Sequence, residues 1–471
     1  MRPAVTVALA ALSVCPLRAG EERAINPRVK EVIDAVSEQR IEAIYKKLES
    51  FGTRYIYSAQ DDPEHGIGAA RKWIFSEFQS YSPRLQVSYD TYRVRKKGRL
   101  VRDVELQNVV AVLPGTINKD RYLIVSGHYD SAVMRRPEPG AASSGSGGSG
   151  IAPVADDAFE KAGSMQTAPG VNDDGSGTAA VLELARVMSK YEWRNSIVFI
   201  AFTGEEEGLV GSTLYARSAR KDNRIIDAVL NNDIIGDDVA GNGRVDNGTV
   251  QVYSEDPADS PSREIARYIK EVGERYIPGM RIELVFRQDR FGRGGDHIPF
   301  NEQGYGAVRF TTPNENFANQ HSLTDVFANV SVPYTARVIR INGPALASLA
   351  LAPKPPATTE QVTRNGKPQT VTMISRGRTR PAGSSRYDAL LRWKDENPEP
   401  DLAGYSILMR STTAPNWERE IFVGNVAEYL MKDVSIDDRV FGVRAIDRDG
   451  NASLVTPYRL RPRPPLEVET Y

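Results

Sequence analysis

The chain has 471 residues, which is enough for more than one domain with a hydrophobic core of its own. Its 60 Lys and Arg residues nearly balance its 61 Asp and Glu residues, giving a formal net charge of -1. This balance argues against proteins that bind nucleic acid or acidic membrane surfaces through a strongly basic face.

The N-terminal segment is a short apolar run behind a single arginine. It predicts a signal peptide over residues 1–20, with cleavage near Ala19 or Gly20, and hence a secreted or periplasmic protein. The run is too short to give a stable membrane span after processing. Its one cysteine, Cys15, is the only cysteine of the chain, and a lipid anchor on Cys15 is the alternative. Cleavage at Ala19 leaves no thiol for disulfides, metal binding or nucleophilic catalysis.

Residues 21–352 alternate between helical and strand-like patterns. Apolar residues recur at helical spacing from Asn26 to about Gly52 and again from Gly68 to Gln79. Strands are expected at Asn108–Leu113, Tyr122–Ser126, Ser196–Phe202, Ala228–Asn232, Thr249–Tyr253, Arg281–Phe286 and Ala307–Thr311. Further helices are expected at Thr178–Met188, Ser212–Ala219, Ser260–Tyr276 and Pro333–Leu351. This alternation predicts a three-layer α/β sandwich around a mainly parallel sheet.

A tract rich in Gly, Ser and Pro, residues 134–169, interrupts this pattern. It is too polar and too rich in glycine to pack, so we expect a flexible insertion. A plain surface loop and a lid over a nearby site are the two alternatives.

The C-terminal part has a different pattern. A proline-rich linker, residues 353–358, leads into short alternating strands over residues 359–471, separated by turn sequences. This pattern predicts an all-β, immunoglobulin-like sandwich, and Leu391-Arg-Trp-Lys394 and Gly404-Tyr-Ser-Ile407 resemble a fibronectin type III module. No histidine or charged pair stands out there, so no chemistry is assigned to the module. Its partner is unknown.

Side chains able to bind a metal lie where the predicted strands end. They are His128 and Asp130, Asp173 or Asp174, Glu205 and Glu206, Asp233, and the later His321. Each motif alone is weak, because Asp173-Asp-Gly is typical of a turn or helix cap and acidic runs are usually solvated. Loops at the carboxyl ends of parallel strands converge on one crevice, so these residues can meet there. Carboxylates buried together need a cation between them.

The motifs occur in a family-specific order over about Phe51 to Leu351. They are Gly127-His-Tyr-Asp-Ser131, Gly170-Val-Asn-Asp-Asp-Gly-Ser-Gly177, Gly204-Glu-Glu-Glu-Gly208, Asn231-Asn-Asp233 and His321-Ser-Leu-Thr-Asp325. This ordered set resembles the zinc-dependent aminopeptidases of peptidase family M28, clan MH. The resemblance implies the zinc exopeptidase fold and peptide substrates with a free N-terminus.

The resemblance also implies two zinc ions per chain. The ligands would be His128 and Asp233 on one ion, Glu206 and His321 on the other, and Asp173 between them. A site built from histidine and carboxylate ligands without thiolate suits hydrolytic zinc chemistry.

The remaining site residues would have supporting or catalytic roles. The resemblance implies that Glu205 is the general base and that Asp130 holds the ring of His128. Asp296 and Asp325 match supporting residues less closely, and the Asp173–Asp174 peptide is expected to be cis. Glu205 suits its role because it adjoins a ligand yet is itself free to accept a proton.

Two competing interpretations remain. One is a glutaminyl-cyclase-like acyltransferase with a single zinc, which shares the sequence Asp296-His-Ile-Pro-Phe300. The other is an inert exported binding protein whose working part is the β-domain. Serine hydrolases and other zinc peptidases are disfavoured, because the G-x-S-x-G and His-Glu-x-x-His motifs are missing.

The segment from Asp289 to His297 is open to two interpretations. Either Arg290 or Arg293 meets a substrate carboxylate in the pocket, or the segment is a turn with solvated arginines.

Overall fold

The structure is a computed structural model that describes residues 25–134, 164–364, 366–376, 388–395 and 399–459. The expected signal peptide and most of the expected insertion, residues 135–163, lie outside the described residues. The chain divides into two compact units, Ile25–Ala352 and a C-terminal unit that begins at Pro353, and each is described by itself.

The first unit is built around a mixed eight-stranded sheet in the order β1-β2-β4-β3-β5-β8-β6-β7. The strands are β1 Gln86–Val94, β2 Val104–Leu113, β3 Asn118–His128, β4 Asn195–Phe202, β5 Ile225–Asn232, β6 Thr249–Ser254, β7 Arg281–Val285 and β8 Ala307–Thr311. The four central strands β4, β3, β5 and β8 run parallel, as does the pair β6–β7, whereas the other three pairings are antiparallel. The parallel centre places the carboxyl ends of β3, β4 and β5 at one edge of the sheet.

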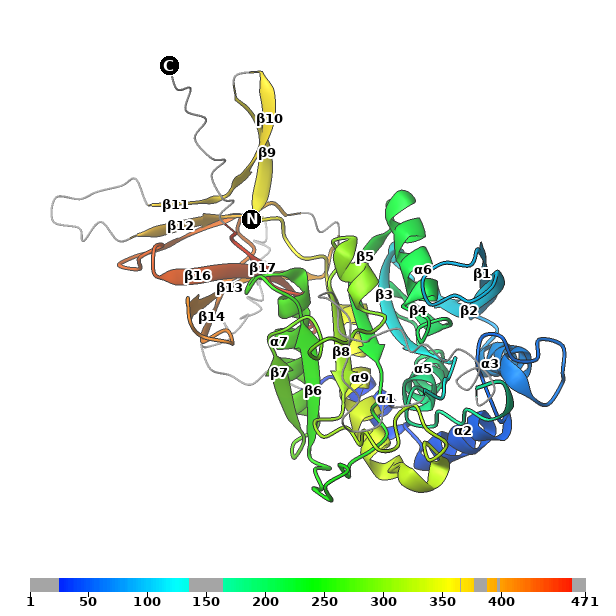
Figure 1. Cartoon of the computed structure of the whole chain (residues 1–471). Helices are drawn as coiled ribbons and strands as arrows, with labels where there is room; N and C mark the ends of the chain where they lie inside the picture. Colours follow the sequence, from blue (N-terminus) through cyan, green and yellow to red (C-terminus); the bar gives the residue numbers. More distant parts are fainter. Residues whose placement is uncertain (1–24, 135–163, 365, 377–387, 396–398, 460–471) are drawn as a thin grey trace, which may run out of the picture. The chain divides into compact units, whose positions relative to one another are not determined.

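Helices lie on both sides of this sheet (Figure 1). They are α1 Pro27–Asp34, α2 Glu38–Ser50, α3 Gly66–Tyr81, α5 Gly175–Met188, α6 Val210–Lys221, α7 Pro261–Tyr276, α8 Ile298–Glu302, the 3₁₀ turn η1 Phe327–Asn329 and α9 Val332–Leu351. All eight residues of β4 are buried, and alternate side chains of that strand pack with α6 and α8. The predicted three-layer α/β sandwich is confirmed, with a sheet that is more mixed than expected.

Two local expectations were wrong. The segment from Asn26 to Gly52 forms two helices rather than one, because the Ser37 side chain accepts a hydrogen bond from Arg40 N and starts α2. The edge strand β1 was missed because none of its residues is fully buried, which leaves a weak apolar pattern.

The C-terminal unit is all-β, as predicted. Its strands are β9 Thr359–Arg364, β10 Lys367–Thr372, β11 Ile374–Arg376, β12 Ala389–Arg392, β13 Leu402–Ser411, β14 Arg419–Gly424, β15 Glu428–Met431, β16 Arg439–Asp447 and β17 Thr456–Pro457. They form a β9–β10 hairpin and two antiparallel sheets, β11-β12-β15 and β14-β13-β16-β17. Side chains from both sheets, among them Leu391 and Ile407, share one core. The fibronectin type III assignment stays a prediction.

Within the described ranges, no helix combines the length and the apolar character needed to cross a membrane.

Candidate metal centre

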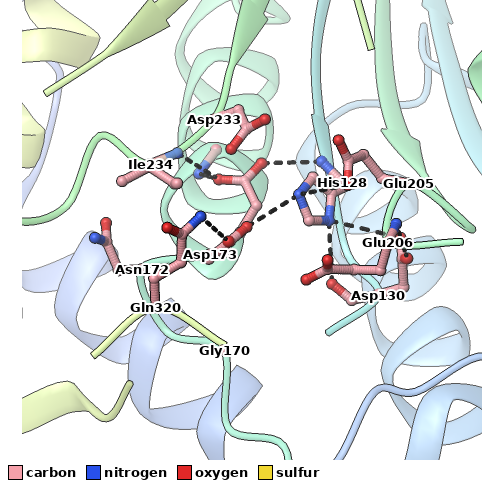
Figure 2. Close-up of polar contacts among 12 residues, drawn as sticks. His128, Asp130, Gly170, Asn172, Asp173, Glu205, Glu206, Asp233, Ile234 and Gln320 are labelled. Atoms are coloured by element: carbon pink, nitrogen blue, oxygen red, sulfur yellow. Dashed lines mark hydrogen bonds and ion pairs between the residues drawn. The ribbon is translucent and has the colours of Figure 1, made fainter. Parts of the chain in front are cut away.

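The candidate ligands converge at the carboxyl edge of the central strands. Figure 2 shows four of them, His128, Asp173, Glu206 and Asp233. His128 is the last residue of β3, Glu205 and Glu206 follow β4, and Asp233 follows β5. Asp173 directly precedes Asp174, which caps helix α5. The fold therefore brings together side chains that lie far apart in the sequence.

These side chains form two clusters that fit metal ions. In each cluster the potential ligand atoms lie within 4.8 Å of one another. The first cluster contains His128, Glu205 and Asp233, and the second contains Asp173, Glu206 and His321. All five residues expected as ligands are present, but Glu205, expected as the base, also lies within the first cluster.

Asp173 belongs to the second cluster and also faces His128 of the first. Its Oδ1 atom is 3.3 Å from Nε2 of His128, and its Oδ2 atom is 3.0 Å from Nε2 of His321. The side-chain amide of Gln320 donates a hydrogen bond of 2.9 Å to the same Oδ2 atom. One carboxylate thus faces both histidines, which is the arrangement that a shared ligand requires.

The ring of His128 is oriented by Asp130, although not in the expected way. Nδ1 of His128 lies 3.1 Å from the backbone oxygen of Asp130 and 3.6 Å from its carboxylate. A proton on Nδ1 satisfies that backbone oxygen and leaves Nε2 with a free lone pair that points into the site. The carboxylate of Asp130 instead accepts a hydrogen bond of 3.2 Å from the backbone N–H of Glu206.

Two further carboxylates hold the backbone around Asp173. Asp325 accepts hydrogen bonds from the backbone N–H groups of Asn172 and Asp173, at 2.7 and 3.0 Å. Asp174 accepts from Gly177 N at 2.7 Å and from His128 N at 3.0 Å. Asp174 is therefore a helix cap rather than a ligand. The Asp173–Asp174 peptide is cis, as expected.

The start of α5 packs directly on the end of β3. A Cβ atom on Gly127 would lie 2.6 Å from the backbone of Gly177, and one on Gly177 would lie 2.1 Å from the backbone oxygen of Asn232. Only glycine fits this close approach of two backbones. The contact fixes the distance between His128 and the Asp173 segment.

Two buried arginines that sequence reasoning missed support the site. Arg54 is fully buried and donates to four backbone carbonyl oxygens, two of which belong to Tyr129 and Gly170. Nothing in the sequence around Arg54 marks this role. Arg309 lies 3.0 Å from a carboxylate oxygen of Asp233, and an arginine inside an otherwise apolar strand is a signal that sequence analysis can detect.

Burial and mutual repulsion shift the pKa values of the carboxyl groups at this site. Burial raises the pKa of Glu205 well above its usual range, and nearby carboxylates add to this effect. Burial also raises the pKa of Asp233 to about 6 and the pKa values of Asp296 and Asp325 to about 7. Burial alone would lower the pKa of His128, but Glu205 and other surrounding carboxylates outweigh it and raise that pKa.

The donor atoms fit zinc. Among the described residues, His128 Nε2 and Glu206 Oε1 are buried and have no hydrogen-bond partner. Buried polar atoms are normally paired, so unpaired ones that face a cluster of carboxylates suit metal ligands.

A cavity of about 810 Å³ opens over both clusters. Besides Glu205 and the candidate ligands other than His128, its lining includes Phe291, Phe317, Arg99, Arg290 and Arg293. Arg290 and Arg293 line the cavity, and both are ion-paired with the Glu315 carboxylate, at 2.9 and 2.6 Å. They are therefore not free, solvated arginines, and a contact with a substrate carboxylate stays a prediction.

Sequence comparison decides the family. The pattern of peptidase family M28 matches residues 108–344. A probable zinc metalloprotease of Leptosphaeria maculans is 33% identical over 449 residues, which are 89% of this chain and 94% of that protein. One of Pyricularia oryzae is 36% identical over 464 residues, 91% of this chain and 84% of that protein. The chain belongs to peptidase family M28. This M28 peptidase is thus a metallopeptidase, and its relatives point to zinc as its metal.

Solved structures agree with the fold of this M28 peptidase. The aminopeptidase LapA of Legionella pneumophila superposes with a TM-score of 0.50 at 20% identity, over 71% of this chain and 78% of LapA. A glutaminyl cyclase of Macrostomum lignano gives a TM-score of 0.50 at 14% identity, over 69% and 93% of the two chains. The fold is common to both enzyme classes, so the choice between them depends on the site.

Proposed function

We propose that this M28 peptidase is a di-zinc aminopeptidase that removes N-terminal residues from peptides. The observation that carries this proposal is the position of Asp173, whose two carboxylate oxygens face His128 and His321, one each. A mono-zinc site needs no such shared carboxylate.

In this proposal His128 and Asp233 would hold one zinc, Glu206 and His321 would hold the other, and Asp173 would be shared. Three protein ligands for each ion would leave room for water and substrate. The buried position of these carboxylates supports the assignment, because they would repel one another without cations.

Glu205 acts as the general base. Bound zinc supplies an acidified water and stabilises negative charge on the carbonyl oxygen. Glu205 accepts the proton of the attacking water and returns it to the nitrogen of the leaving amine. The position of Glu205 supports this role: its side chain lines the cavity, and its Oε2 atom lies 4.0 Å from Nε2 of the candidate ligand His128.

The second candidate is the glutaminyl-cyclase-like acyltransferase, which the similar fold of the Macrostomum lignano enzyme keeps open. Metal content per chain by elemental mass spectrometry, combined with peptide assays, separates the candidates. About two zinc ions per chain with chelator-sensitive release of N-terminal residues supports the aminopeptidase. About one zinc with cyclisation of N-terminal glutamine overturns it, as does properly folded protein with no metal and no turnover.

We also propose that the enzyme is exported. The support is the apolar run behind Arg2 that ends near Ala19. N-terminal sequencing of the protein recovered from the medium or periplasm tests this, and retention of Met1 in the cytoplasm contradicts it.

A further inference from the structure

The loop between β1 and β2, residues 95–103, reaches the candidate metal centre. Arg99, in the turn of this loop, lines the same cavity as Asp173 and Glu205. Its Nη1 atom donates a hydrogen bond of 3.3 Å to the backbone oxygen of Glu206. No residue of this loop has a place in the proposed chemistry.

The loop is held in a defined position. Leu100 is buried, and its backbone N–H donates to Lys97 O at 3.0 Å. The hydroxyl of Tyr57 accepts from Val101 N at 3.0 Å and donates to Arg102 O at 3.1 Å. The guanidinium of Arg102 also lies over the Tyr57 ring, 4.7 Å from its centre. Arg99 is therefore presented to the cavity by an anchored turn rather than by a free loop.

Arg99 differs from the other arginines of the cavity in its partners. Arg290 and Arg293 share the carboxylate of Glu315, with nitrogen–oxygen distances between 2.6 and 3.0 Å. Arg99, by contrast, forms no ion pair within 4.0 Å among the described residues, and its side chain is exposed. Its charge is available to a bound ligand.

The carboxylates of the two clusters do not need the positive charge of Arg99 for their neutralisation either. Four carboxylates line the cavity, those of Asp173, Glu205, Glu206 and Asp233, and two divalent cations would balance four negative charges. An unpaired guanidinium beside such a centre attracts an anionic group of the substrate, and it prefers a carboxylate because its N–H groups match that geometry.

We infer that Arg99 is a specificity-determining residue that binds a carboxylate of the peptide close to the scissile bond. This inference rests on the proposed aminopeptidase function and deepens it by naming a substrate class. Two groups carry the same chemistry: the C-terminal carboxylate of a dipeptide, and an acidic side chain at the first or second residue. Paired substrates distinguish these sources.

The test compares wild type with Arg99→Gln and Arg99→Lys in the zinc-loaded full chain. The substrate pairs are Leu-Ala against Leu-Ala-amide, Glu-Ala-amide against Gln-Ala-amide, and Leu-Asp-amide against Leu-Asn-amide. For at least one pair, we expect Arg99→Gln to lower the ratio of kcat/KM for the anionic over the neutral substrate by about five- to tenfold, mainly through KM. Arg99→Lys should retain part of the ratio. The pair that responds identifies the source of the carboxylate.

A binding measurement accompanies the kinetics. The probe is a Leu-Ala analogue in which a methylene-amine link replaces the scissile amide, titrated by calorimetry as the free acid and as the amide. If the C-terminal carboxylate is the source, Arg99→Gln should lower the affinity ratio of acid to amide by the same factor. An affinity ratio that stays constant while the kinetic ratio for Leu-Ala falls would overturn the inference, because binding is the role assigned to Arg99.

The matched control is Arg95→Gln, which removes the same charge from an exposed position of the same loop outside the cavity. The inference is wrong if Arg99→Gln changes none of the three ratios, or if Arg95→Gln changes them equally. Failure of the proposed function looks different, because wild type would then cleave none of the six peptides.

Discussion

Oε2 of Glu205 lies 4.0 Å from Nε2 of His128. Glu205 is therefore near enough to belong to the first cluster, although we propose that it is the base. We expect Glu205→Gln to lower kcat/KM by about three orders of magnitude, because the amide cannot accept the water's proton. Zinc content should stay near two ions per chain. Assays on Leu-Ala-amide and elemental mass spectrometry check both expectations.

The comparison for this variant is Glu206→Gln. Glu206 Oε2 lies 3.0 Å from His321 Nε2, so this change should remove a ligand and lower the zinc content as well as the rate. If Glu205→Gln loses as much zinc as Glu206→Gln does, Glu205 is a ligand rather than the base.

Removal of metal should destabilise the peptidase unit, because its buried carboxylates then lose their counter-charge. We expect the thermal unfolding midpoint of chelator-treated protein to rise by about 5 °C when zinc exceeds its dissociation constant about a hundredfold. Differential scanning calorimetry measures the midpoint. Magnesium at the same concentration is the control, because it binds imidazole ligands poorly. Equal midpoints with and without zinc would contradict the proposed site.

Arg54 should be one of the most sensitive positions for stability. Its side chain bonds four backbone carbonyl oxygens, including Tyr129 O at 2.7 Å and Gly170 O at 2.7 Å. Arg54→Met leaves these buried acceptors unpaired, so we expect the free energy of unfolding to fall by about 3–5 kcal/mol. Urea unfolding provides the measurement. Arg217→Met, on the exposed face of α6, should change it by less than about 0.5 kcal/mol.

Asp237 should make stability depend on pH. Burial raises the pKa of its carboxyl to about 6, so the folded state binds its proton more tightly than the unfolded state does. The resulting stabilisation is complete below the unfolded pKa of about 4 and is lost as pH rises through 6.

The variant Asp237→Asn removes this titration. We therefore expect the unfolding free energy of Asp237→Asn minus that of wild type to grow between pH 4 and pH 7, by at most about 3 kcal/mol. Both proteins are unfolded in urea without zinc, so that metal release does not contribute. A difference that is constant over this range would show that Asp237 keeps an ordinary pKa.

The sequence predicted the core of the fold well and its margins poorly. Strand β4 was recognisable because every residue of Asn195–Phe202 is buried, which requires an apolar run. Strand β1 was missed because it lies at the edge of the sheet and none of its residues is fully buried. The break between α1 and α2 depends on one capping hydroxyl, that of Ser37, which interrupts the helix without interrupting its apolar spacing.

The candidate ligands could be named from the sequence because most of them follow recognisable strands and all of them belong to short motifs in the order that resembles peptidase family M28. The ion pairing of Arg290 and Arg293 could not be predicted from the sequence. It depends on Glu315, which lies 22 to 25 residues further along the chain. The loop that carries Arg99 is likewise positioned by Tyr57, through contacts that no local pattern records.

The sequence by itself determined which residues can bind metal and that a layered α/β unit carries them, since strand periodicity and the short motifs are local properties. Only the tertiary structure decided that Asp173 faces both histidines while Asp174 caps α5. It also decided that Arg54 supports the site and that Arg99 reaches the cavity. The physical reason is that hydrogen bonds and ion pairs depend on distances of a few ångströms between distant segments. Those distances are set by how the strands, helices and glycine contacts pack, as between Gly127 and Gly177.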